Sequence, residues 1–382
     1  MNSYPLFEKE ILPKLISFNN FYDLTGNYTN KQKGDFFEII TKYIFLFHPF
    51  YKNITKHIWL YNEIPYDLFK KLNIPQKDKG IDLVLLTNEY KYYAIQSKFR
   101  NNKKTLINWK DLSTFVGLTF GVSEKFQGAF YVTNTIIINE ELLKCKRVIP
   151  IFDDFFDSLD NNFFEQIKCH FDNNKINNQY QLHIKRNYQI EFLQKSNDYY
   201  KTNDKGYINF APGSGKTLMS YWFYQQLNPK YTIIGVPSLY LLSQFYKEWS
   251  YESYFENNME FILIGSDVDI DNEPFINNGL LITTDQFEIY EKIVIFQNDN
   301  KNKNKNLIII TTYQSCDKLY FAIDFTKIKF NLGIIDEAHK TCQQLGHQFS
   351  ILISDSKIKI EKRLFMQQLL EFIKMLEMIM KI

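Results

Sequence analysis

Seven consecutive residues in the second half of the chain have the types that phosphate binding requires: Ala211, Pro212, Gly213, Ser214, Gly215, Lys216 and Thr217. They lie between a strand-like run and a helix-like run, where glycines let backbone N–H groups face an anion at the start of a helix. Lys216 would contact the β- and γ-phosphates of a nucleotide, and Thr217 would place its hydroxyl on Mg²⁺. The full motif has a glycine where this chain has Phe210, so an ordinary glycine-rich turn is the alternative.

Two adjacent carboxylates follow an apolar run further along the chain. Asp336 and Glu337 come directly after Leu332–Ile335, so a buried strand would deliver both to the edge of a sheet. Asp336 would hold magnesium through water, and Glu337 would polarise the attacking water in phosphoryl transfer. Such a pair alone is often a solvated strand end, but together with the upstream loop it predicts a site for ATP and Mg²⁺.

A third group of polar residues lies in the first half of the chain. Glu38 falls on a predicted amphipathic helix, Asp82 starts a predicted strand, and Gln96 and Lys98 alternate along the next strand, on one face. Asp82 and Gln96, with Glu38, could supply oxygen ligands to a metal, and Lys98 a cation near a scissile phosphate. A half-buried hairpin with solvated ends is the alternative.

The elements that would position these N-terminal residues form an alternating α/β unit. A helix is predicted from Gly34 to Phe47, followed by strands at Ile81–Thr87 and Tyr92–Phe99. A helix around Leu112–Phe120 and a strand at Gly128–Thr133 complete the pattern.

The second half predicts a doubly wound parallel sheet. Short Ile-, Leu- and Val-rich runs without alternation suit strands covered on both faces. They begin at Tyr207, Tyr231, Glu260, Gly279, Leu307 and Asn331. The predicted fold class is therefore α/β in both halves.

The loop Gly213–Thr217 and the Asp336-Glu-Ala-His339 box resemble the superfamily 2 helicases, in the branch found in type I and type III restriction enzymes. The resemblance covers Lys185–Met366 and implies a first RecA-like lobe. It also implies that Gln189, in Arg186-Asn-Tyr-Gln189, reads adenine. Val236–Ser238 and Thr311–Ser315 would hold a nucleic-acid backbone, DNA or RNA.

The N-terminal pattern Gly34-x-x-x-Glu38, Gly80-Ile-Asp82 and Gln96-x-Lys98 resembles the Mrr-like branch of the PD-(D/E)xK restriction endonucleases. The resemblance covers Gly34–Thr135, and glutamine replaces the more usual acidic ligand. It implies a nuclease fold and a Mg²⁺-dependent endonuclease site. A basic cluster of Lys98, Arg100, Lys103 and Lys104 would suit phosphate contacts.

These patterns predict five segments: a helical extension over 1–33, a nuclease-like domain over 34–160, a linker over 161–184, a motor lobe over 185–366 and an aberrant tail over 367–382. The family's Thr-Ala-Thr-Pro motif is expected after Lys362–Met366 but is missing, and a one-nucleotide frameshift there would restore it. We therefore expect a truncated motor, its second lobe encoded downstream, that binds ATP without unwinding duplexes.

The composition excludes some functions. The net charge of +2 gives no general attraction to nucleic acid, so such binding must come from local patches. Four scattered cysteines argue against zinc or disulfides, and no signal or membrane segment is found, so a soluble intracellular protein is expected. A helicase–nuclease is the leading hypothesis; a non-catalytic nucleic-acid-binding remnant and a P-loop enzyme acting on small molecules are the alternatives.

Overall fold

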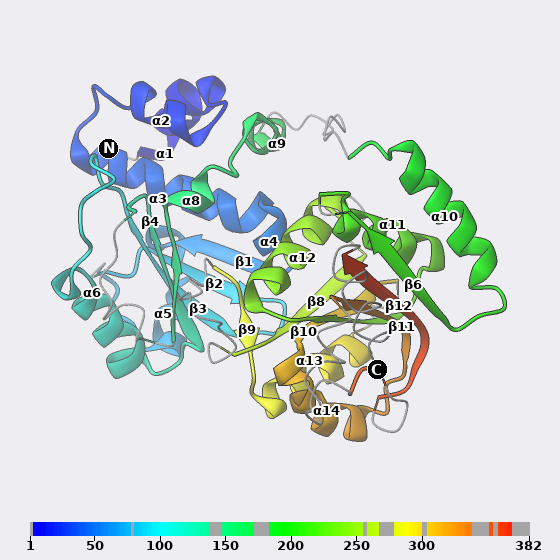
Figure 1. Ribbon diagram of the computed structural model, residues 1–382. Coiled ribbons are helices and arrows are strands. Elements are labelled where there is room, and N and C mark those ends of the chain that lie inside the picture. Colours follow the sequence, from blue (N-terminus) through cyan, green and yellow to red (C-terminus); the bar gives the residue numbers. More distant parts are fainter. Residues whose placement is uncertain are drawn as a thin grey trace. The chain divides into compact units, whose positions relative to one another are not determined.

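The chain forms two compact units in the computed structural model (Figure 1). The N-terminal unit comprises Met1–Tyr180 and Ile276–Leu280, and the C-terminal unit comprises Gln181–Phe275 and Leu281–Ile382. The structure describes residues 3–77, 80–136, 145, 147–171, 183–211, 213–254, 258–266, 279–299, 304–337, 351–353 and 358–368.

A five-stranded mixed sheet forms the centre of the N-terminal unit. Its strands follow chain order: β1 (Thr55–Leu60), β2 (Leu83–Thr87), β3 (Tyr92–Lys98), β4 (Gly128–Thr133) and β5 (Val148–Ile151). The pairs β1–β2 and β2–β3 are antiparallel, and β3–β4 and β4–β5 are parallel. The change of direction follows from the connections, because a short turn joins β2 to β3 whereas a parallel neighbour needs a longer crossover.

Helices flank this sheet, and α3 (Asn30–Phe47) is the longest of those described. Thr29 and Gln32 cap its start reciprocally, and Phe36, Phe37, Ile40 and Ile44 form a buried stripe at helical spacing. The Thr41 and Ser97 hydroxyls lie 2.9 Å apart, which joins α3 to β3. The other α-helices are α1 (Ser3–Leu6), α2 (Phe18–Leu24), α4 (Pro49–Lys52), α5 (Tyr66–Leu72), α6 (Trp109–Val116), α8 (Asp153–Phe156) and α9 (Asn161–Phe171).

The structure corrects two predicted segment boundaries. Residues 161–171, expected to be linker, form α9, whose Phe163, Phe164 and Ile167 are buried. The predicted boundary at 33/34 falls inside α3. The boundary expected near Asp172–Asn178 lies outside the described residues.

A seven-stranded, wholly parallel sheet forms the centre of the C-terminal unit, which confirms the predicted fold class. The strand order is β6-β12-β11-β7-β10-β8-β9. The strands are β6 (Lys205–Phe210), β7 (Tyr231–Val236), β8 (Met259–Ile264), β9 (Ile282–Thr283), β10 (Asn306–Thr312), β11 (Phe330–Asp336) and β12 (Ile360–Gln368). The predicted tail from residue 367 thus begins inside β12, and residues 369–382 lie outside the described part.

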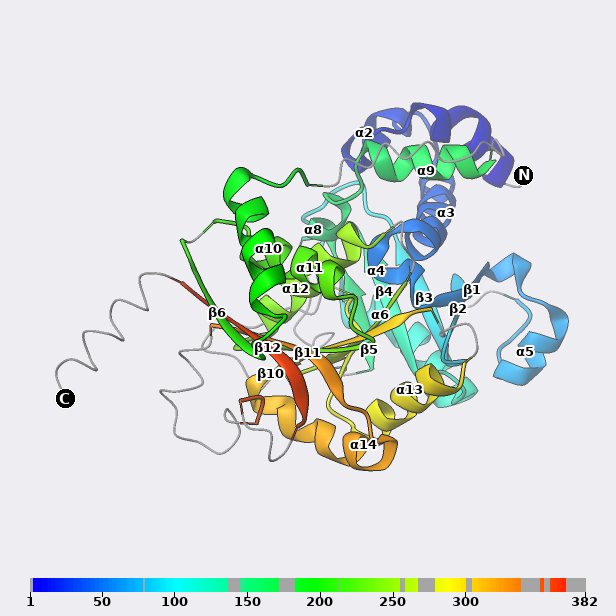
Figure 2. The same cartoon turned by 90° about the vertical axis from the view of Figure 1, so that its right-hand side faces the viewer.

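Helices cover both faces of this sheet (Figure 2). One face carries α10 (Asn187–Tyr199), α11 (Lys216–Leu227) and α12 (Leu239–Glu252), and the other carries α13 (Gln286–Asn298) and α14 (Leu319–Thr326). Coverage of both faces explains why every residue of β10 is buried.

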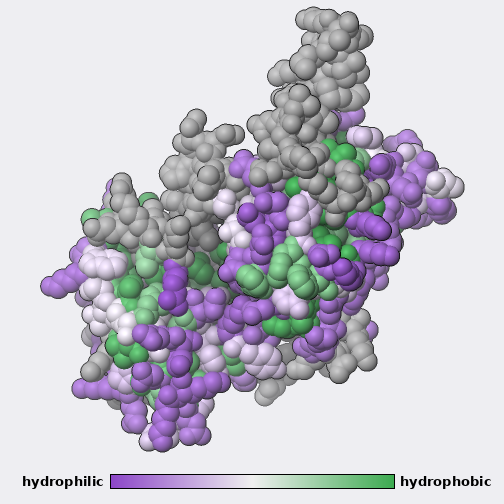
Figure 3. Space-filling view, turned by 90° about the horizontal axis from the view of Figure 1, so that it is seen from below, coloured by the Kyte–Doolittle hydropathy of each residue, from purple (hydrophilic) through white to green (hydrophobic). Residues whose placement is uncertain are grey.

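An apolar patch lies on the surface over α13 and α14 (Figure 3). Phe287 and Phe325 are 67% and 62% exposed there, and both rings pack against Phe321.

A buried arginine fixes the chain that leads into β12. Arg363 is 1% exposed, and its guanidinium donates to the carbonyl oxygens of Leu352 at 2.9 Å and Ile360 at 3.1 Å. This contact holds residues 351–353 against β12.

The described residues include no helix that is both long and apolar enough to cross a bilayer. Cys145, Cys169 and Cys316 are free thiols, and Cys342 lies outside the described residues.

Candidate functional site

The predicted phosphate-binding loop connects the end of β6 to the start of α11. Gly213 and Gly215 have φ of +75° and +78°, the left-handed region that glycine adopts at no steric cost. A Cβ at position 215 would also lie 3.0 Å from the Gln189 Nε2. Backbone conformation therefore favours glycine at both positions, and a side chain at position 215 would also press against the Gln189 amide. Pro212 lies outside the described residues.

Lys216 and Glu337 meet although 121 positions separate them in the sequence. The Lys216 Nζ lies 2.9 Å from the Glu337 Oε1, and both side chains are largely buried. Glu337 follows the last residue of β11 and has φ of +50°, which turns the chain at the sheet edge. The loop and the acidic pair thus form one site.

Asp336 and Thr217, the two residues predicted to serve magnesium, are also buried, at 4% and 8% exposure. Tyr313 donates its hydroxyl to the Asp336 carbonyl oxygen. The Thr217 carbonyl oxygen accepts from the Trp249 Nε1 at 3.3 Å, so packing from α12 fixes the first turn of α11.

Gln189 lies against the phosphate-binding loop. Its Oε1 accepts from the Arg186 N–H at 2.8 Å, which closes a capping box at the start of α10. Its Nε2 donates to the Ser214 carbonyl oxygen at 3.0 Å, and the Tyr188 hydroxyl donates to the same oxygen at 2.8 Å. That Gln189 reads adenine stays a prediction, with one amide N–H left to do so.

The structure does not favour the nucleic-acid contacts expected from Thr311–Ser315. Thr311, Thr312 and Ser315 are buried, and Gln314 is the exposed residue of the stretch. The Thr311 hydroxyl donates to the Thr312 carbonyl oxygen at 3.0 Å, and contact of this stretch with nucleic acid stays a prediction. The Ser238 hydroxyl caps α12 by accepting from the Leu241 N–H at 3.4 Å.

The N-terminal unit brings together three of the four residues predicted for its site. The Asp82 Oδ2 accepts from the Ser97 N–H at 2.7 Å, which places this carboxylate beside Gln96 and Lys98 on β3. Gln96 is 2% exposed, and its Nε2 donates to the Gly80 carbonyl oxygen at 2.9 Å. Its Oε1 is buried and has no hydrogen-bond partner among the described residues, as suits an oxygen that awaits a ligand.

Glu38 lies on α3 and borders a cavity of about 950 Å³ that Asp35 and Tyr61 also line. The Tyr61 N–H donates to the Asp82 carbonyl oxygen at 2.9 Å. Tyr61 therefore both lines this cavity and contacts the backbone of Asp82.

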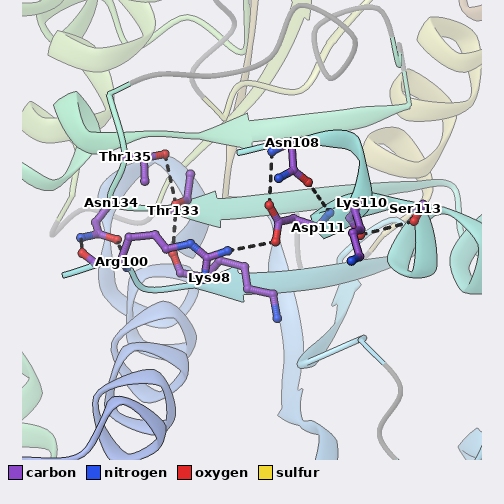
Figure 4. Close-up of polar contacts among 9 residues, drawn as sticks. All are labelled: Lys98, Arg100, Asn108, Lys110, Asp111, Ser113, Thr133, Asn134 and Thr135. Atoms are coloured by element: carbon purple, nitrogen blue, oxygen red, sulfur yellow. Dashed lines mark hydrogen bonds and ion pairs between the residues drawn. The ribbon is translucent and has the colours of Figure 1, made fainter. Parts of the chain in front are cut away.

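The basic cluster after β3 is largely committed to ion pairs. Arg100 pairs with Asp111 at 3.1 Å and Lys103 with Asp153 at 2.8 Å. Figure 4 shows the Lys98 side chain pointing away from the Arg100–Asp111 pair, with its ammonium outside these contacts. Lys98 and Lys104 are outside these ion pairs, and Lys98 is the one that lies on β3, beside Asp82.

Asn134 clamps the chain just beyond Lys98 (Figure 4). It is fully buried; its Oδ1 accepts from the Arg100 N–H and its Nδ2 donates to the Arg100 carbonyl oxygen, both at 2.7 Å. Asn134 could not be predicted as a site residue, because a lone asparagine carries no pattern until its partners are known. Tyr188 lies in the quoted Arg186–Gln189 element, but its contact with the loop depends on the fold.

The buried Tyr131 hydroxyl lies near charged side chains of this site. Burial raises the pKa of the Tyr131 hydroxyl; the nearby carboxylates of Asp111 and Asp82 add to the rise, and Arg100 opposes it. Tyr131 lies beside Gln96 in the β3–β4 register and stays a neutral phenol.

The two folds define a class of protein in which a helicase-type α/β domain and a restriction-endonuclease-like domain share one chain. Residues 183–375 match the family model described as type III restriction enzyme, res subunit, which covers half of the chain. The chain belongs to this family. Residues 47–175 match a model described as restriction endonuclease, a range that begins after Glu38. No curated protein matches the chain.

One solved structure matches most of the chain, across both units. The ATP-dependent Type ISP restriction-modification enzyme LlaBIII bound to DNA matches 91% of this chain, with 23% identity and a TM-score of 0.69. A nuclease-deletion mutant of the Type ISP enzyme LlaGI with a DNA substrate mimic matches 48%, with 26% identity and a TM-score of 0.40. The matches cover 22% and 17% of those chains, so this chain spans about a fifth of their length.

Proposed function

We propose that this chain is an ATP-dependent motor on nucleic acid, most simply DNA, whose N-terminal unit is a Mg²⁺-dependent endonuclease. The observation that carries the motor is the 2.9 Å contact between the Lys216 Nζ and the Glu337 Oε1. It brings together a cation that would bind phosphate and a carboxylate that would accept a proton from water. The known complexes of Type ISP enzymes with DNA support DNA as the polymer.

The residues at this edge fit a magnesium nucleotide. The start of α11 offers N–H groups that have no partner within the helix. Lys216 would transfer from Glu337 to the phosphates, which frees the Glu337 carboxylate to accept a proton from water. Asp336 and Thr217 are oxygen donors of the kind that magnesium takes. When bound, the metal supplies charge neutralisation of the phosphates.

The N-terminal site also fits a metal. Asp82 precedes β2, and Gln96 lies on the neighbouring strand β3. The Asp82 carboxylate and the buried Gln96 Oε1 are both hard oxygen donors. The Gly80 carbonyl oxygen fixes the Gln96 amide so that its Oε1, rather than its nitrogen, is the free end. Lys98 would stabilise charge on the scissile phosphate.

ATP turnover with and without single-stranded DNA, duplex DNA and RNA tests the motor. Stimulation by DNA is expected, and stimulation by RNA alone would reassign the polymer. Turnover indifferent to every nucleic acid would favour a P-loop enzyme acting on small molecules. Nucleotide binding without turnover, together with no cleavage in Mg²⁺, would favour the non-catalytic remnant.

A further inference from the structure

We propose that Tyr188 and Gln189 form a latch that sets the direction of a phosphate-binding amide, the Gly215 N–H. The inference rests on the proposed function and deepens it, because it gives these two residues a role at the phosphates. Tyr188 is then a positioning residue of the nucleotide site.

The latch consists of two donors on one carbonyl oxygen. The Tyr188 hydroxyl and the Gln189 Nε2 lie 2.8 Å and 3.0 Å from the Ser214 oxygen. The capping contact with the Arg186 N–H fixes the Gln189 amide, so its nitrogen is the end that faces the loop. The Arg186 Nη1 also lies 3.4 Å from the Tyr188 hydroxyl.

Because the peptide bond between Ser214 and Gly215 is planar and trans, the direction of the Ser214 carbonyl fixes the direction of the Gly215 N–H. The C=O and N–H of one peptide unit point in opposite directions because the unit is planar. When the Ser214 carbonyl is held toward α10, the Gly215 N–H faces away from α10. That N–H precedes α11, where helix-initial amides have no intrahelical partner and attract anions.

The conformation of Gly215 fits the same assignment. Its φ of +78° is accessible mainly to glycine, and a Cβ would collide with the Gln189 amide at 3.0 Å. The loop at Gly215 therefore lies directly against the Gln189 side chain of α10. A loop held only by its own turn would not need such contact.

The decisive variant is Tyr188→Phe, which removes one hydroxyl from a partly exposed ring. Its control is Tyr199→Phe, because Tyr199 lies on the same helix and donates to the Lys205 carbonyl oxygen at 2.9 Å, away from the loop. A fluorescent ATP analogue bound to the full chain is displaced by ATP, GTP or inorganic tripolyphosphate. Melting temperatures verify that both variants are folded.

The latch predicts that Tyr188→Phe weakens all three competitors by the same factor, roughly three- to tenfold, the size of one neutral hydrogen bond. Tyr199→Phe should bind as wild type does. A loss confined to ATP would overturn the inference, because it would place these residues at the base. No loss, or equal loss in both variants, would also overturn it. A wild-type chain that binds none of the three ligands would contradict the proposed function as well.

Discussion

At the residue scale, each candidate site combines a cation and a carboxylate from different elements. Lys216 of α11 meets Glu337 beyond β11, and Lys98 of β3 lies beside Asp82, which precedes β2. Lys216 and Glu337 already touch, so each neutralises the other before any ligand arrives, which lowers the cost of burying both charges. Binding a nucleotide must therefore break this pair. The Lys98 ammonium, in contrast, stays apart from the ion pairs that occupy Arg100 and Lys103.

Glu337→Gln should separate binding from turnover. The variant removes the carboxylate that competes with phosphate for Lys216, so ATP affinity should hold or rise. Hydrolysis should fall by about 10²-fold or more, because the proton acceptor is lost. Equilibrium binding and steady-state turnover check the two parts. The exposed Glu361→Gln on β12 is the control, and an equal loss of affinity and turnover in Glu337→Gln would contradict the assignment.

Lys98→Met should reduce Mg²⁺-dependent DNA cleavage by about 10²- to 10³-fold, because a charge near the scissile phosphate is removed. Asp82→Asn should do the same through the metal. Plasmid nicking over time measures both. Lys125→Met, an exposed lysine ahead of β4, is the matched control; cleavage that survives in Lys98→Met and Asp82→Asn excludes this site.

At the element scale, the sequence predicted the strands and helices that carry the motifs and missed several that carry none. The strands β2, β3 and β4 and the helices α3 and α11 lie where apolar periodicity placed them. The strand β1 has a mixed burial pattern, and β5 is short, so neither presents a clear period. The helices α13 and α14 were missed because Phe287 and Phe325 are exposed aromatics, which blur a one-sided pattern.

The sequence likewise predicted some features of the candidate sites and missed others. Residue types and spacing predicted Lys216 with Glu337 and Asp82 with Gln96 and Lys98, because parallel strands end at one edge and side chains alternate along a strand. The burial of Thr311 and Thr312 could not be predicted, because it depends on how η7 (Tyr313–Lys318) folds over the end of β10. The contacts of Tyr188 depend on where α10 packs, which no local pattern encodes.

Asn134→Ala should destabilise the N-terminal unit by about 2–4 kcal/mol, because it leaves the Arg100 N–H and carbonyl without partners in a buried position. Urea unfolding, followed by circular dichroism, measures the loss. Asn102→Ala, on the exposed turn beyond β3, serves as the comparison. If the two variants unfold at the same urea concentration, Asn134 does not clamp this chain.

At the scale of the whole molecule, two compact units correspond to two matched families, a restriction endonuclease over 47–175 and a res subunit over 183–375. Each candidate site is built from residues of one unit. A ligand that binds one site should therefore stabilise the unit that contains this site.

Saturating Mg²⁺-ATP should raise the thermal stability of the C-terminal unit by about 2.7 kcal/mol at a hundredfold excess over the dissociation constant. Lys98→Met should show the same stabilisation, because its site belongs to the other unit. Calorimetric melting with and without nucleotide checks this. Loss of the stabilisation in Lys98→Met would show that the two sites are not independent.

Titration calorimetry of Mg²⁺-ATP into the wild-type chain and Lys216→Ala tests the convergence of the loop and the acidic pair most directly. A single site is predicted in the wild type, weakened about 10- to 100-fold in the variant, since a charge-assisted contact to phosphate is lost. Equal affinity in the two proteins would contradict the account, because the nucleotide would then bind away from Lys216 and Glu337.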